Sequence, residues 1–148
     1  MKKLLLLFIT TSLLGCAQEK EKIFNYNDIK FYGKKRGDMK LAYHKQDNTL
    51  VTGKVRDWFH MGQLNLEESY KNGKSEGVAK RWHANGQLIN DEIYKDGKLE
   101  GIAKWWHPNG QLSSEGIYRD GKRVGIVKSW HEKGQLKSEG TFNDGKAE

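Results

Sequence analysis

The sequence has 148 residues, a formal net charge of +7 and a mean hydropathy of −0.85, and 30% of its residues are charged. This length is about that of one domain, but the hydrophobic content of 36% is low for a compact domain with one core. The single cysteine excludes a disulfide bond within the chain. A layered repeat architecture tolerates this composition better than a globule does.

Residues 1–15 have the pattern of a cleaved lipoprotein signal peptide. Lys2 and Lys3 precede an apolar run from Leu4 to Ile9, and Cys16 follows a short Leu-Leu-Gly segment. The apolar run is too short to cross a hydrocarbon core about 30 Å thick. Residues 13–16 resemble the bacterial lipobox. This resemblance implies that the Cys16 sulfur receives a diacylglycerol, that cleavage follows, and that the new amino terminus is acylated.

Lipidation of Cys16 predicts an exported protein that is lipid-anchored on the cell membrane or the outer membrane. Two or three acyl chains give durable anchoring, because each buried methylene contributes about 0.8 kcal/mol. Ala17 follows the cysteine in place of aspartate, which resembles lipoproteins that are passed on to the outer membrane. Residues 16–28 are predicted to form a polar tether, since residues 17–22 are mostly polar and of mixed charge.

Residues 29–52 are predicted to form an atypical N-terminal hairpin that caps the fold. Candidate strand segments lie at residues 39–43 and 49–51, with Gln46, Asp47 and Asn48 as the turn between them. This region does not match the repeats that follow it.

From Gly53 to the last residue, the chain repeats one 24-residue unit four times without insertion. The copies span residues 53–76, 77–100, 101–124 and 125–148, and each has a tryptophan five residues after its first glycine. A fixed period of this length marks stacked supersecondary units that bury their apolar surfaces on one another. The repeats therefore predict an elongated fold.

Asn-Gly and Asp-Gly dipeptides recur through the repeats, and both are strong signals for β-hairpin turns. If Asn109 and Gly110 form the centre of a two-residue turn, residues whose numbers sum to 219 lie opposite each other. The predicted pairs are then Ile102 with Ile117, Lys104 with Glu115, Trp106 with Ser113, and Gly101 with Tyr118. Such combinations stabilise a sheet. The sequence predicts an all-β fold, an elongated single-layer antiparallel sheet of tandem hairpins.

The repeats resemble the bacterial variant of the MORN (membrane occupation and recognition nexus) repeat. The resemblance rests on Trp-x-x-Asn-Gly-Gln-Leu, then Glu, then Tyr-x-Asp-Gly-Lys, and it covers residues 53–148. It implies an elongated, twisted, single-layer antiparallel sheet. It also implies a scaffold or membrane-associated module, or an antitoxin-like role, a label often given to bacterial proteins with this variant. Phe59 and Met61 depart from the pattern, which predicts a looser first hairpin.

The recurring histidines and acids are not predicted to form a metal or catalytic site. Equivalent positions in successive hairpins lie two strands apart, about 10 Å, whereas zinc needs its ligands about 2 Å from one centre. Each acid faces a basic partner, which favours ionised and unreactive carboxylates. We therefore expect a protein that is not an enzyme, without catalytic residues, metal or cofactor. The positions concerned are His83, His107, His131, Glu67, Asp91, Glu115 and Glu139.

Two sets of recurring side chains are candidate binding surfaces. The sheet has too few apolar residues to hide both faces, so its aromatic side chains are expected to stay partly exposed and to contact a partner. These aromatic positions are Trp82, Tyr94, Trp105, Trp106, Tyr118 and Trp130. A basic stripe is either a solvated face or a contact for anionic headgroups or an acidic protein. Its members are Arg56, Lys80, Lys104 and Lys128.

Together these features favour a lipid-anchored, non-enzymatic scaffold that binds another protein or an envelope polymer. Nucleic acid is not an expected partner, because a secreted lipid-anchored protein rarely meets it. The last strand is expected to be a sheet edge, which allows self-association unless charge protects it. Two alternatives stay open. One is an antitoxin or immunity protein that neutralises a toxin by binding, and the less favoured one is an envelope hydrolase.

Overall fold

The computed structural model describes residues 22–32 and 41–148. The predicted signal peptide, Cys16 and residues 33–40 lie outside the described residues. The N-terminal elements are β1 (Ile23–Asn25), the 3-10 helix η1 (Tyr26–Asp28), β2 (Ile29–Tyr32) and β3 (Leu41–His44). The repeats form β4 (Gly53–Trp58), β5 (Leu64–Lys71), β6 (Lys74–Trp82), β7 (Leu88–Lys95), β8 (Lys98–Leu99), β9 (Gly101–Trp106), β10 (Leu112–Arg119), β11 (Lys122–Trp130), β12 (Leu136–Asn143) and β13 (Lys146–Ala147).

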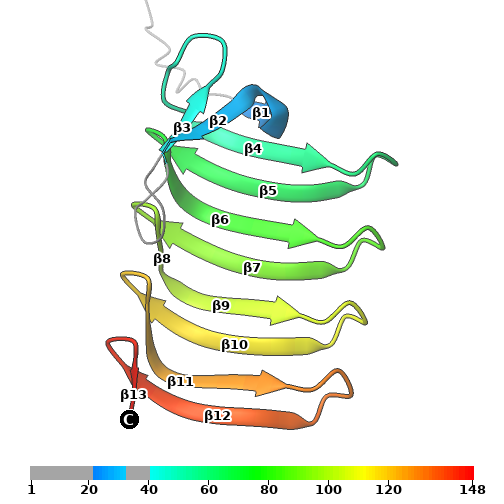
Figure 1. Cartoon of the computed structure of the whole chain (residues 1–148), viewed down its shortest axis with the longest axis vertical. Coiled ribbons are helices and arrows are strands. Elements are labelled where there is room, and N and C mark those ends of the chain that lie inside the picture. Colours follow the sequence, from blue (N-terminus) through cyan, green and yellow to red (C-terminus); the bar gives the residue numbers. More distant parts are fainter. Residues whose placement is uncertain (1–21, 33–40) are drawn as a thin grey trace, which may run out of the picture.

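Most of these strands belong to one elongated sheet, as the sequence predicts. Ten of its eleven strands follow the order β1-β4-β5-β6-β7-β9-β10-β11-β12-β13, and the eleventh, β8, pairs with β7. Neighbouring strands are antiparallel, except that β1 runs parallel to β4. Figure 1 shows the strands stacked as a curved ribbon, with β2 and β3 at one end. The predicted all-β, antiparallel architecture is confirmed.

The predicted register holds over most of each repeat hairpin. In the last three copies, an acid faces a lysine, a branched side chain faces another, and an aromatic ring faces a glycine, which are stabilising cross-strand combinations. The observed pairs are Val78 with Ile93, Lys80 with Asp91, Gly77 with Tyr94, Ile102 with Ile117, Lys104 with Glu115, Gly101 with Tyr118, Ile126 with Thr141, Lys128 with Glu139, and Gly125 with Phe142.

The predicted two-residue turn at residues 109–110 is wrong, and so is the pairing of Trp106 with Ser113. The His107 amide donates a hydrogen bond of 2.8 Å to the Gln111 carbonyl oxygen, and this bond closes a three-residue loop. The last loop residue has a positive φ of 83°, as in a type I turn followed by a glycine bulge. Trp106 pairs with Leu112, and a bulge in β10 then restores the predicted register.

The turns between repeats are the two-residue turns that Asp-Gly predicts. Asp120 and Gly121 have φ angles of 52° and 79°, and a type I′ turn needs positive φ at both central residues. In the last three copies, each turn also bonds to the copy before it. The Gly121 amide donates to the Leu99 carbonyl over 2.9 Å, and Lys98 lies 3.3 Å from the Asp120 carboxylate. These bonds tie successive repeats together at this end.

The first glycine of each repeat marks a bend in its strand. Gly53, Gly77, Gly101 and Gly125 have φ angles of 137°, 99°, 79° and 69°. Side chains other than that of glycine are strained in this region of φ. The pairing of β11 with β10 skips two residues at this point. Glycine therefore lets the chain leave a turn and then run along the sheet.

β1, η1, β2 and β3 form a cap on one face of the first repeat. Its core holds Ile29, Ala42 and Val51 together with Val55 and Tyr70 of the repeat, all of them buried. The prediction that the polar tether extends to residue 28 is wrong, because β1 pairs with β4 and its middle residue packs against this core. The described chain is therefore anchored to the sheet from residue 23 onward.

Within the cap, the predicted pairing of residues 39–43 with residues 49–51 is present for the described residues. The Val51 amide donates to the Ala42 carbonyl over 3.0 Å, and the His44 amide donates to the Thr49 carbonyl over 2.9 Å. The sequence did not predict that β3 would also pair with β2 on its other side.

The first repeat hairpin is as tightly closed as the others, contrary to prediction. The Phe59 amide donates to the Gln63 carbonyl over 2.8 Å, as the equivalent amides do in later copies. Its loop differs in its side-chain bonds to the next copy. Asn109 donates to the Glu132 carbonyl over 2.7 Å, whereas Met61 at the matching position is 84% exposed.

Candidate binding surfaces

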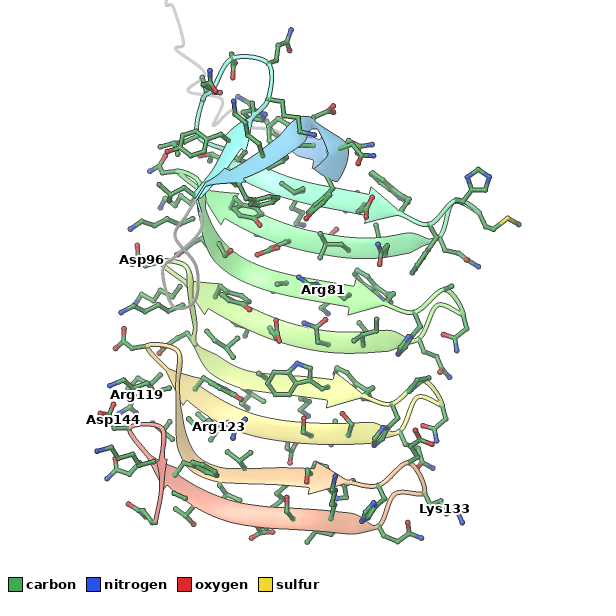
Figure 2. The ribbon with its side chains drawn as sticks, in the orientation of Figure 1. Arg81, Asp96, Arg119, Arg123, Lys133 and Asp144 are labelled. Carbon is green, nitrogen blue, oxygen red and sulfur yellow. The ribbon has the colours of Figure 1, made fainter. Side chains whose placement is uncertain are left out.

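The repeat sheet has two faces with different chemistry, because side chains alternate between them along each strand. The face beneath β2 and β3 is here named the cap face, and the opposite one the open face. Along β9 and β10, the cap face carries Ala103, Trp105, Ser114, Gly116 and Tyr118. Along the same strands, the open face carries Ile102, Lys104, Glu115 and Ile117. Figure 2 is viewed onto the cap face, with Arg81 and Arg123 over it and Asp96 and Asp144 at the turn edge.

An aromatic column runs along the cap face. Tyr70, Tyr94, Tyr118 and Phe142 occupy the same position in the four copies. In the first copy, Phe31 of β2 packs on Tyr70 with the ring centroids 6.2 Å apart, and Tyr70 is only 7% exposed. The three counterparts in later copies are half-buried. The cap thus covers the first ring of a column that continues beyond it.

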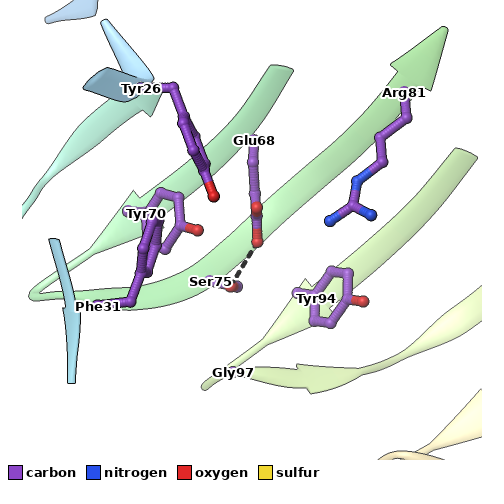
Figure 3. Close-up of a pocket in the computed structure, with 8 residues that line it drawn as sticks. All are labelled: Tyr26, Phe31, Glu68, Tyr70, Ser75, Arg81, Tyr94 and Gly97. Atoms are coloured by element: carbon purple, nitrogen blue, oxygen red, sulfur yellow. Dashed lines mark hydrogen bonds between the residues drawn. The ribbon is translucent and has the colours of Figure 1, made fainter. Parts of the chain in front are cut away.

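A cleft of about 260 Å³ opens beside the cap. Its lining residues are Tyr26, Phe31, Glu68, Tyr70, Ser75, Arg81, Tyr94 and Gly97. Figure 3 shows the Glu68 and Arg81 side chains pointing into the cleft from the neighbouring strands β5 and β6. The Ser75 hydroxyl donates to Glu68 over 2.7 Å, whereas Arg81 forms no ion pair with any described residue. The cleft thus combines a carboxylate, a guanidinium with free donors and aromatic walls.

Two tyrosines of this cleft keep their protons far above neutral pH. Burial raises the pKa of the Tyr70 hydroxyl well above its ordinary value, and the nearby Glu68 carboxylate raises it further. Burial also raises the pKa of Tyr94, with Glu92 as the second cause. The Tyr94 hydroxyl donates to Glu92 over 3.1 Å. Both phenols are therefore neutral hydrogen-bonding groups and not nucleophiles.

A second hollow lies further along the cap face, between the third and fourth copies. Its volume is about 410 Å³, and it is lined by Trp105, Ser113, Ser114, Tyr118, Arg123 and Val127. The Trp105 and Tyr118 rings meet edge to face with centroids 6.0 Å apart. Arg123 donates from Nε to the Tyr118 hydroxyl over 3.3 Å, and its guanidinium lies 5.4 Å from the Phe142 ring centre. Aromatic and arginine side chains together are typical of contact surfaces.

The predicted aromatic surface is divided between two places in the fold. Tyr94, Trp105 and Tyr118 lie on the cap face and line its hollows. The other members lie at strand ends beside the three-residue loops, where each pairs with a leucine, and these are Trp82, Trp106 and Trp130. Only the first group shares a surface with Glu68 and Arg81.

The predicted basic stripe lies on the open face and is neutralised there. Arg56 forms an ion pair with Glu67 at 2.6 Å. Lys80, Lys104 and Lys128 lie 3.1, 3.8 and 3.3 Å from the acids that face them. An anionic headgroup would compete with these carboxylates for each cation. The stripe is therefore a weak candidate for binding a membrane or an acidic protein.

One of the recurring histidines contributes to the stacking of the loops. His107 Nε2 lies 2.9 Å from the carbonyl oxygen of Trp130 in the next copy. Within residues 22–32 and 41–148, no cluster of three or more histidine, cysteine or acidic side chains has the arrangement to hold a metal ion. Over the same described ranges, none of the helical segments has the length and apolar character that a membrane crossing requires.

Sequence reasoning missed the polar residues of the cleft. Arg81 stands in a column where the other copies have Asp57, Trp105 and Ser129, while Glu68 stands in one where the last two copies have glycine. Both of these variable columns lie on the cap face. Variation within an otherwise regular repeat is the sequence signal that identifies this face.

Comparison with known proteins agrees with the repeat organisation. The model of the MORN repeat variant family matches residues 75–96, 99–120 and 123–144. Each matched segment begins two residues before the first glycine of the second, third or fourth copy. MORN repeats are generally modules that bind proteins or membranes. A search of curated proteins found no match to the chain.

Proposed function

We propose that this protein is a lipid-anchored, non-enzymatic scaffold of the cell envelope, and that its cap face binds a segment of another protein or of an envelope polymer. The observation that carries this proposal is the aromatic column that continues past the cap. Phe31 covers Tyr70 in the first copy, and Tyr94, Tyr118 and Phe142 offer the same kind of surface in later copies. A partner segment lying there continues the packing that the cap begins.

The polar groups of the cap face give this surface directionality. Arg81 offers guanidinium donors in the cleft, and Glu68 offers carboxylate acceptors from the adjacent strand. Aromatic side chains and arginine are enriched at the centres of protein interfaces. The match to a family of protein- and membrane-binding modules supports a binding role as well.

An anchor on Cys16 would hold the N-terminal end of this face close to the membrane. Seven residue steps separate Cys16 from the start of β1 at Ile23, and an extended chain covers at most about 3.5 Å per step. The first strand of the sheet is therefore held within about 25 Å of the acylated cysteine. This reach suits a scaffold that holds an envelope component near the membrane surface.

A photo-crosslinking residue tests the proposal in the cells that make the protein. Full-length chains carry it at Trp105 or Ser114 on the cap face, or at the exposed loop residue Lys133 as the control. We expect the two cap-face positions to give one shared adduct with a protein or a polymer, and the control to give none. An absence of adducts from both cap-face positions, or an equal adduct from the control, contradicts the proposal.

The neutralisation alternative uses the same face, and the same experiment separates it from the scaffold. An adduct whose partner is a toxin, and whose toxicity returns when the cap face is altered by Arg81→Glu, favours an antitoxin or immunity protein. A structural component of the envelope as the partner favours the scaffold.

A further inference from the structure

A row of exposed aliphatic side chains lies on the open face. Val78, Ile93, Ile102, Ile117 and Ile126 are each between 41% and 55% exposed. Ile102, Ile117 and Ile126 also line one shared hollow of about 230 Å³. A contiguous apolar surface of this kind on a soluble domain marks a contact surface.

Beside this row, the open face carries an unbroken ladder of alternating charges. Each rung is the direct cross-strand neighbour of the next, from β4 to β12. The ladder reads Arg56, Glu67, Lys80, Asp91, Lys104, Glu115, Lys128, Glu139. It has four cations and four anions, and successive rungs lie about 4.8 Å apart.

From this arrangement we infer that the open face packs against the open face of a second copy of this chain. The two-fold axis lies between β7 and β9 and runs parallel to the strands. Two sheets packed face to face lie about 10 Å apart with side chains interleaved, as in a β-sandwich. Because both sheets twist, the contact is closest at the centre of the ladder.

The charge order makes the ladder complementary to itself about this axis. The rotation brings the first rung opposite the eighth and reverses the order between them. Every cation then faces an anion, because the ladder alternates and has an even number of rungs. The facing pairs are Arg56 with Glu139, Glu67 with Lys128, Lys80 with Glu115, and Asp91 with Lys104, each joining one copy to the other. An axis along the length of the ladder would set like charges together instead.

Four of the five aliphatic side chains also meet one another about this axis. The rotation leaves positions along the strand unchanged, so this row packs against the same row of the second copy. Ile93 then faces Ile102 of the second copy, and Val78 faces Ile117. These four residues surround the axis, whereas Ile126, at the end of the row, faces Ser69 of the second copy. The most apolar part of the open face thus coincides with the closest contact.

A second copy fits this face better than a membrane does. The ladder has no net charge, so anionic headgroups gain nothing from it. Each rung also keeps its ion-pair partner within its own hairpin, as Lys80 does with Asp91 at 3.1 Å. Packing therefore leaves no rung as an unpaired buried charge, which would be strongly destabilising.

Two charge-swapped variants of the full chain test the inference. One carries Lys104→Glu with Glu115→Lys, and the other carries Lys80→Asp with Asp91→Lys. Each swap keeps a cation opposite an anion within its hairpin. In a pair of identical variant chains, however, each swap sets like charges against each other at the centre. A mixed pair of the two variants is complementary at every facing position.

Sedimentation equilibrium in mild detergent, with Cys16→Ser in every chain to remove the lipid site, gives the stoichiometry. We expect the parent chain to be dimeric, each swapped variant to dimerise about tenfold or more weakly, and an equimolar mixture of the two to recover dimers. A monomeric parent overturns the inference. Swapped variants that stay fully dimeric also overturn it, since they point to pairing at the β12 edge. A mixture of the two variants that does not form dimers overturns it as well.

Discussion

Replacing two equivalent glycines by alanine tests how the cap closes on the repeat sheet. Gly53 and Gly101 each open a repeat and have positive φ angles of 137° and 79°. At Gly101, an added Cβ meets no atom within 4 Å. At Gly53, it lies 2.4 Å from the Lys22 carbonyl oxygen and 3.0 Å from Cε2 of Phe24. Both substitutions strain the backbone, but only the one at Gly53 adds a steric clash.

The loss in the free energy of unfolding can be estimated for each substitution. A non-glycine residue in this conformation costs about 1–2 kcal/mol, and the lower entropy of the unfolded chain offsets about 0.4–1 kcal/mol of that. Gly101→Ala should therefore lower the free energy of unfolding by about 1 kcal/mol. At Gly53, the Lys22 carbonyl accepts a hydrogen bond from the Lys54 amide over 2.8 Å and cannot move without breaking it. Overpacking adds about 1–3 kcal/mol, so Gly53→Ala should cost about 2–4 kcal/mol in all.

Urea unfolding of the full chain measures both values, followed by tryptophan fluorescence and far-ultraviolet circular dichroism. The two probes should give coincident transitions if the array unfolds cooperatively. The order of the two variants is the critical result. If Gly53→Ala costs no more than Gly101→Ala, then β1 does not lie against β4 as described, and the account of the cap is refuted.

Three further predictions concern ionisation and the anchor. Tyr70 and Tyr94 should ionise well above the ordinary tyrosine pKa of about 10 in a spectrophotometric titration. Above that pH the unfolded state releases protons that the folded state retains, so the free energy of unfolding should fall as the pH rises, and less steeply in Tyr94→Phe. A double-mutant cycle on Arg56 and Glu67 should give a coupling of about 0.2–1 kcal/mol that shrinks with added salt, and a salt-independent coupling would contradict a partly exposed pair. Cys16→Ser should abolish labelling by a clickable fatty acid and release the protein from membranes, whereas unchanged labelling would exclude Cys16 as the lipid site.

The residue pattern within each repeat predicted the strand register, because several cross-strand columns agree on it. Lys104 with Glu115 and Ile102 with Ile117 are set by side-chain complementarity, which sequence alone displays. The loop was predicted wrongly because Asn-Gly fits both a two-residue turn and a type I turn with a glycine bulge. The bulge in β10 then compensates for the longer loop, so the register beyond it is the same in both cases.

The cap and the cleft could not be predicted from local pattern. β1 pairs in parallel with β4, a contact between segments some thirty residues apart with no repeat to reveal it. Phe31 of β2, which pairs with β3, lies over Tyr70 and forms one wall of the cleft beside Glu68 and Arg81. Long-range packing therefore creates the candidate site, while the periodic sequence provides the surface on which it forms.

The parity of the charge ladder has a consequence for the evolution of such arrays. Each 24-residue copy contributes one cation and one anion, so gain or loss of a whole copy always leaves an even number of rungs. One more copy lengthens the sheet by two strands, about 10 Å, without changing the rule by which two chains would match. Only chains with equal numbers of copies can satisfy every rung. The number of repeats would therefore determine which chains associate, favouring pairs of equal length over pairs of unequal length.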